Sequence, residues 1–152
     1  MPANHESLLA GRNAQPLDAH MIRSATTAFM GLDALAPVKY EPEVRTQFRV
    51  RIQGDAEIAE IVFGPDIYPG QGIDANSTLS VLAVAAHELI HLQRWRDHRE
   101  ITNPALIEID EALTSLEAIH RFAEELSPHE CRLLVADAMQ RLQMYAQRQP
   151  AP

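Results

Sequence analysis

The sequence predicts an α+β domain: a small twisted sheet with an N-terminal helix and a C-terminal set of three helices. Two observations predict this class. Apolar and polar residues alternate strictly over 48–53, which is typical of a half-buried strand. Apolar residues recur at helical spacing over 17–35 and again in three segments between 77 and 147, which is typical of amphipathic helices.

The N-terminal half predicts one helix and one hairpin. Pro16 stands near the start of the helix over 17–35, and Pro37 ends it. In the hairpin Phe48–Phe63, Gly54-Asp55 supplies the turn and 57–63 is the returning strand. We expect this returning strand to lie at an edge of the sheet.

The C-terminal half predicts helices behind a loop. Residues 64–76 contain so many prolines and glycines that we expect no regular structure there. Asn76 or Ser77 is expected to cap a helix that runs to about residue 98, and a second helix covers about 105–126. Ser127-Pro128-His129-Glu130 is a capping box that begins a last helix.

Length and composition predict one soluble domain. The 152 residues, with 46% hydrophobic and 22% charged side chains, fit a single domain over 1–152, with loose tails at 1–15 and 148–152. A net charge of −8 argues against nucleic acid as a partner. The chain has no apolar run long enough for a membrane span, and we expect a cytoplasmic location. Because Cys131 is the only cysteine, a metal site would use His, Asp or Glu.

The motif that carries chemistry is His87-Glu88-Leu89-Ile90-His91. Residues four apart lie one above the other on a helix, so both imidazoles can reach one ion. Glu88 stands beside them, where it can act as general base towards a water activated by zinc. The pattern therefore predicts a hydrolase with Zn²⁺ as cofactor and Glu88 as a catalytic residue.

The segment around this motif resembles the gluzincin metallopeptidases, the thermolysin-like clan. In that family HExxH is followed by a glutamate ligand on a second helix, and Ile109-Asp110-Glu111-Ala112-Leu113-Thr114-Ser115 is similar to its ligand helix. The twenty residues from His91 to Glu111 match the spacing, and the resemblance covers about 81–116. It implies a metallopeptidase with His87, His91 and Glu111 as metal ligands. Glu108 is the alternative third ligand, because residues three apart share a helix face.

One position departs from the family. Four residues after the ligand glutamate, where the family often has an aspartate that orients a metal-bound histidine, this chain has Ser115. A serine can hydrogen-bond an imidazole but brings no charge. Asp110, Glu108 and Asp74 are candidates for the missing carboxylate, and the sequence does not choose among them.

An oxyanion donor is also required. Tyr68 is the preferred candidate, because it follows the presumed edge strand, with His129, Tyr40 and Tyr145 as alternatives. An extended peptide or protein substrate is expected to pair with the edge near 57–63. The small size predicts a cleft that is shallow or completed by a regulatory protein partner.

Two other classes of function are compatible with the same residues. Glu88-x-x-His91 and Glu117-x-x-His120 together have the form of the motif pair that holds two irons in ferritin-like helical bundles. A zincin-like binding domain without catalytic activity is the other alternative. The Arg94, Arg96 and Arg99 cluster is interpreted as a solvated last turn of a helix, favoured by the helix dipole.

Overall fold

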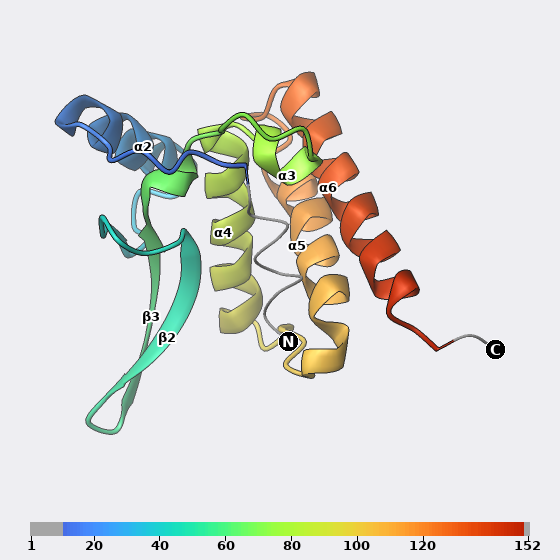
Figure 1. Ribbon diagram of the computed structural model, residues 1–152. Coiled ribbons are helices and arrows are strands. Elements are labelled where there is room, and N and C mark those ends of the chain that lie inside the picture. The colour runs from blue at the N-terminus through green and yellow to red at the C-terminus, as the bar shows by residue number, and fades with distance from the viewer. Residues whose placement is uncertain (1–10, 151–152) are drawn as a thin grey trace.

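The computed structural model describes residues 11–150 and has the α+β architecture predicted from the sequence (Figure 1). One N-terminal helix comes first, the strands follow it, and the larger helices come last. None of these helices has both the length and the apolar character needed to cross a membrane. The elements are α2 Ala19–Leu32, β1 Val38–Tyr40, β2 Gln47–Gln53, β3 Ala56–Phe63, η1 Pro65–Ile67, α3 Ala75–Thr78, α4 Val81–Arg96, η2 Pro104–Leu106, α5 Ile107–Arg121 and α6 Pro128–Gln147.

The sheet has three strands in the order β1-β3-β2. The predicted hairpin is confirmed, since β2 pairs antiparallel with β3 and Phe48 faces Ile61. The expectation that the returning strand forms an edge is wrong, because β1 pairs in parallel with its other side. A three-residue strand between prolines has too little alternation to be predicted. The edge strand next to α4 is β2, and the other edge strand, β1, lies next to α2.

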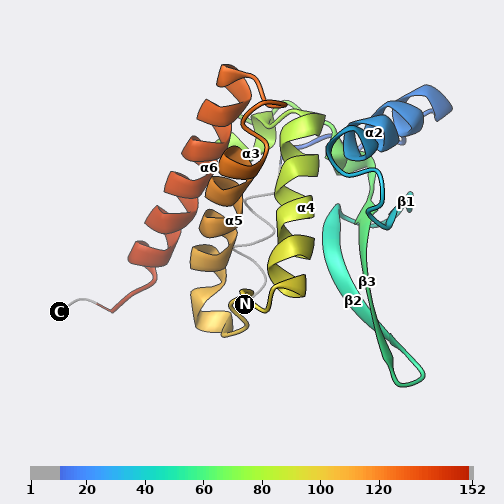
Figure 2. The ribbon, with the colours of Figure 1, turned by 180° about the vertical axis from the view of Figure 1, so that it is seen from behind.

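The alternating pattern of β2 is buried only near the base of the hairpin. Phe48 packs against the core, whereas Ile52 is 73% exposed. In both ribbon views the tip of the hairpin projects beyond the end of α4 (Figures 1 and 2). An apolar face therefore continues past the helix that would cover it.

The helices are stacked in a row beside the sheet. Helix α4 lies between the strands and α5, and α6 packs along α5 (Figure 2). Helix α2 packs across α4, and its Phe29 ring stacks on Phe63 at a centroid distance of 5.8 Å. The core, with Phe29, Phe63 and Ile90 among its fully buried side chains, thus fixes α4 against the sheet.

Helix boundaries follow local capping chemistry. Helix α4 begins after Ser80, whose Oγ accepts the Ala83 N–H at 3.1 Å, so the predicted cap at Asn76 or Ser77 is wrong. Both residues lie in the short helix α3, which together with η1 gives the loop 64–76 more regular structure than expected. The capping box that begins α6 is confirmed.

The segment ahead of α2 is anchored by Arg12. Its buried guanidinium donates to the carbonyl oxygens of Asp66 at 2.6 Å, Asn76 at 2.5 Å and Ile67 at 2.9 Å. Gly70 makes this junction possible, because a Cβ at that position would lie 2.0 Å from the Gly11 carbonyl oxygen.

Residues 11–15 belong to the expected loose tail and include the buried Arg12, while residues 1–10 lie outside the described part of the chain. At the other end, Arg148 contacts Glu108, while residues 151–152 are also outside the described part. Arg12 and Arg148 each bind an oxygen atom of a residue that is distant in the sequence. Local sequence patterns do not predict such contacts.

Replacing Arg12 by alanine should lower the free energy of unfolding by about 3 kcal/mol, because three carbonyls lose a charged donor in a buried place. Urea denaturation measures the change. Arg45→Ala is the matched control, since Arg45 is exposed and its loss should change the free energy by less than about 0.5 kcal/mol. Equal effects of the two substitutions would contradict the role assigned to Arg12.

Candidate metal centre

Helix α4 presents the HExxH motif to the interior. The run ahead of it, Ala83 to Ala86, is buried and fixes the rotation of the helix. His87 and His91 consequently share one face, with ring centroids 4.7 Å apart and an edge-to-face arrangement. The two imidazoles approach each other closely enough to bind one ion.

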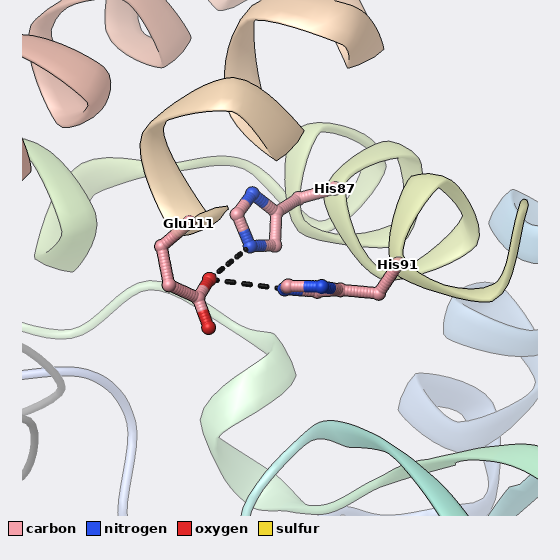
Figure 3. A group of neighbouring side chains, drawn as sticks. All are labelled: His87, His91 and Glu111. Atoms are coloured by element: carbon pink, nitrogen blue, oxygen red, sulfur yellow. Dashed lines mark hydrogen bonds and ion pairs between the residues drawn. The ribbon is translucent and has the colours of Figure 1, made fainter. Parts of the chain in front are cut away.

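Helix α5 brings Glu111 to both histidines. Its Oε2 lies 2.8 Å from His87 Nε2 and 3.0 Å from His91 Nε2 (Figure 3). The three candidate ligand atoms all lie within 4.8 Å of one another. Two imidazole nitrogens and one carboxylate oxygen are a donor set that suits zinc with one position left open. The three residues predicted as metal ligands are thus brought together.

Glu88 lies beside this group and belongs to the wall of the same cavity. Its Oε2 accepts the backbone N–H of Phe48 at 2.9 Å, which ties the helix to the edge strand β2. Burial raises the pKa of Glu88, and the nearby imidazoles and the Phe48 N–H oppose that rise. A carboxyl group with a raised pKa beside metal-binding residues is suited to accept and return a proton.

Charge in the centre is strongly coupled. Burial raises the pKa of Glu111, but His91, Arg141 and His87 outweigh it and hold that pKa well below its usual range. Burial lowers the pKa of His91, yet Glu111 and its neighbouring carboxylates raise it to about 9. Glu111 therefore stabilises positive charge at the two Nε2 atoms, whether a proton or a divalent cation supplies it.

His87 is held from behind by a chain of side chains. Its Nδ1 lies 2.9 Å from Ser115 Oγ, and Ser115 Oγ lies 2.7 Å from Asp137 Oδ2. Asp137 comes from α6 and also accepts from Arg141 Nε at 2.9 Å. Asp137 thus supplies the carboxylate for which Asp110, Glu108 and Asp74 were the candidates from the sequence, and it was not among them. The signal for it was an aspartate and an arginine four residues apart on the buried face of α6.

His91 is backed by Asp110, whose Oδ2 lies 4.0 Å from His91 Nδ1. Asp110 Oδ1 in turn accepts from Arg94 Nη2 at 2.7 Å. Arg94 is only 3% exposed and also binds Glu117, so its interpretation as a solvated residue is wrong. The arginine that follows the motif by three residues is part of the support of the centre.

The centre opens into a cavity of about 790 Å³. Its lining includes the segment from Glu43 to Phe48 and the segment from Glu100 to Pro104, with Ile107. Arg12 and Arg141 contribute positive charge to its lining. A cavity of this volume accommodates several residues of an extended chain, with the three candidate ligands at its wall.

Tyr68 lies elsewhere. Its hydroxyl donates to the Met21 carbonyl oxygen at 2.8 Å, and its ring packs against the hydrophobic core. Neither Tyr68 nor the alternatives His129, Tyr40 and Tyr145 is among the described residues that line the cavity. Tyr68 therefore anchors its loop to α2, where the sequence analysis expected an oxyanion donor.

The second Glu-x-x-His motif does not join the first. Glu117 Oε1 binds Arg94 and Arg99, both at 2.7 Å, and His120 is exposed. Among the described residues, the group with metal-ligand geometry is formed by His87, His91 and Glu111. This arrangement gives no support to a di-iron centre.

Comparisons of the chain with family models, with curated proteins and with solved structures found no match. The resemblance to the gluzincins therefore stays a prediction that depends on the motif and its spacing.

The purified protein should bind one zinc ion per chain, and His91→Ala should abolish that binding because two protein ligands hold the ion poorly. Elemental analysis after dialysis against zinc, followed by removal of weakly bound metal, measures both. His120→Ala is the matched control, since this exposed histidine of α5 lies outside the centre. Zinc retained by His91→Ala, or two irons per chain, would contradict the assignment.

Proposed function

We propose that this protein is a zinc-dependent metallopeptidase that hydrolyses peptide bonds. The observation that carries the proposal is the convergence of His87, His91 and Glu111 within hydrogen-bonding distance, with Glu88 beside them at an open cavity. We keep a cytoplasmic location as part of the proposal.

Zinc supplies a Lewis acid that polarises a carbonyl group and lowers the pKa of a bound water to near 7. The chain supplies the proton transfers. Glu88 takes the proton from the attacking water and returns it to the leaving amine, and the Phe48 N–H holds its carboxylate in place. Tyr68 has no part in the proposal, because its hydroxyl is directed to Met21.

The proposed substrate is a peptide or protein segment in extended conformation. The N–H of Phe48 points away from β3, since it donates to Glu88. In an antiparallel ladder residues two apart point the same way, so the N–H and C=O of Val50 also face the free edge of β2. An extended substrate can add to this edge by main-chain hydrogen bonds, which bring its backbone alongside the centre.

Glu88→Gln should retain zinc and lower kcat/KM for peptide hydrolysis by at least about 100-fold, because the amide cannot accept the proton. A zinc-loaded protein and an unstructured protein substrate measure the rate, and elemental analysis measures the metal. Full activity in the variant would remove Glu88 as general base. If the unsubstituted, zinc-loaded protein cleaves no peptide, the chain is a zincin-like binding domain or requires the regulatory partner considered above.

Val50→Pro should raise KM for peptide substrates several-fold while kcat changes little, because proline removes an N–H from the free edge of β2 and leaves the ladder with β3 intact. Steady-state kinetics measure both constants. Val50→Thr, which keeps the N–H, is the matched control and should leave KM unchanged. An unaltered KM in Val50→Pro would place substrate binding on another segment.

A further inference from the structure

We propose that Asp137, acting through Ser115, positions His87 and thereby sets the affinity of the centre for zinc. This inference rests on the metal site proposed above. It assigns to α6 the orientation of a metal ligand, in addition to the ligands that α4 and α5 supply. In this chain the carboxylate that the family often places on the ligand helix comes from the neighbouring helix and reaches the imidazole through a hydroxyl group.

The hydrogen bonds of this chain run in one direction. Asp137 Oδ2 receives Arg141 Nε at 2.9 Å, and such an ionised carboxylate can only accept. Ser115 Oγ, 2.7 Å away, therefore donates its single proton to Asp137. Having donated that proton, Ser115 Oγ can only accept from His87 Nδ1 at 2.9 Å.

This direction fixes the tautomer of His87. With an ion bound, the ring proton lies on Nδ1 and the Nε2 lone pair faces the ion; without one, Nε2 donates to Glu111 Oε2 at 2.8 Å. A neutral imidazole offers one nitrogen as donor and the other as acceptor, so the partner of the rear nitrogen decides which one can bind metal. The chain of hydrogen bonds from Asp137 thus holds the ring with Nε2 directed at the place where the ion would bind.

Burial makes this chain of hydrogen bonds the main determinant of this orientation. Ser115 and Asp137 are fully buried and His87 is 5% exposed, so solvent is poorly placed to replace a missing partner. Hydrogen bonds in such a low-dielectric interior are strong when satisfied, and loss of one member leaves the others unpaired. His91 depends on a different arrangement, with Asp110 behind it at 4.0 Å and no intervening hydroxyl.

The test is the zinc dissociation constant, measured by competition with a chelator, together with the melting temperature of each metal-free protein. Ser115→Ala and Asp137→Asn should each weaken zinc binding about 10- to 100-fold, the range known for partners of metal-bound histidines. The double variant should be no weaker than the worse single variant, because both residues belong to one chain of hydrogen bonds. Ser115→Asp combined with Asp137→Asn should recover most of the affinity, because it places a carboxylate directly behind Nδ1.

Glu60→Gln is the matched control. It removes a buried carboxylate that is also held by an arginine, on a strand outside the cavity, and zinc affinity should not change. Ser115→Ala leaves the pair between Asp137 and Arg141 intact, so it carries the test if Asp137→Asn fails to fold. Parental zinc affinity in Ser115→Ala, or additive losses in the double variant, would overturn the inference and leave the metal site standing. Failure of the unsubstituted protein to bind zinc would overturn the proposed function itself.

Discussion

The structure depends on placing several carboxylates and two imidazoles close together, mostly buried, without leaving negative charge uncompensated. Two buried arginines compensate the negative charge. Arg141 pairs with Asp137 and lies 3.5 Å from Glu111, and Arg94 joins Asp110 to Glu117. A charge buried without a partner is costly enough to neutralise itself or unfold its surroundings. The arginines of α4 and α6 are therefore as necessary to this cluster as His87, His91 and Glu111.

This compensation links the site to the packing of the helices. Helix α5 supplies Glu111 on one side and Ser115 on the next turn, so it contacts α4 and α6 through polar groups as well as apolar ones. The hydrogen bond from the Phe48 N–H to Glu88 joins the sheet to the same network. Strand β2 and helices α4, α5 and α6 thus meet at one cluster of charged side chains.

The parts of this arrangement that sequence rules predict are those decided within a few residues. The spacing of His87 and His91, the capping box at Ser127 and the alternation around Phe48 each express a local geometry. Asp137, Arg94 and the strand Val38–Tyr40 acquire their roles only from partners far along the chain. Tyr68 shows the converse: its position after a strand suggested a site residue, but the orientation of its side chain follows from its contact with α2.

Arg12 binds carbonyl oxygens 54 to 64 residues away, and it touches main chain where a side chain could have been used. Backbone acceptors are supplied by every residue type, so Asp66, Ile67 and Asn76 could change identity and still keep this partner. The side chains of Asp66 and Asn76, which line the cavity, can therefore vary while the path of the main chain stays the same. The hydrogen bonds of Arg12 thus fix the main-chain path of this part of the cavity wall without fixing its side chains. Substitutions there can change which ligands the cavity accepts while the fold is kept.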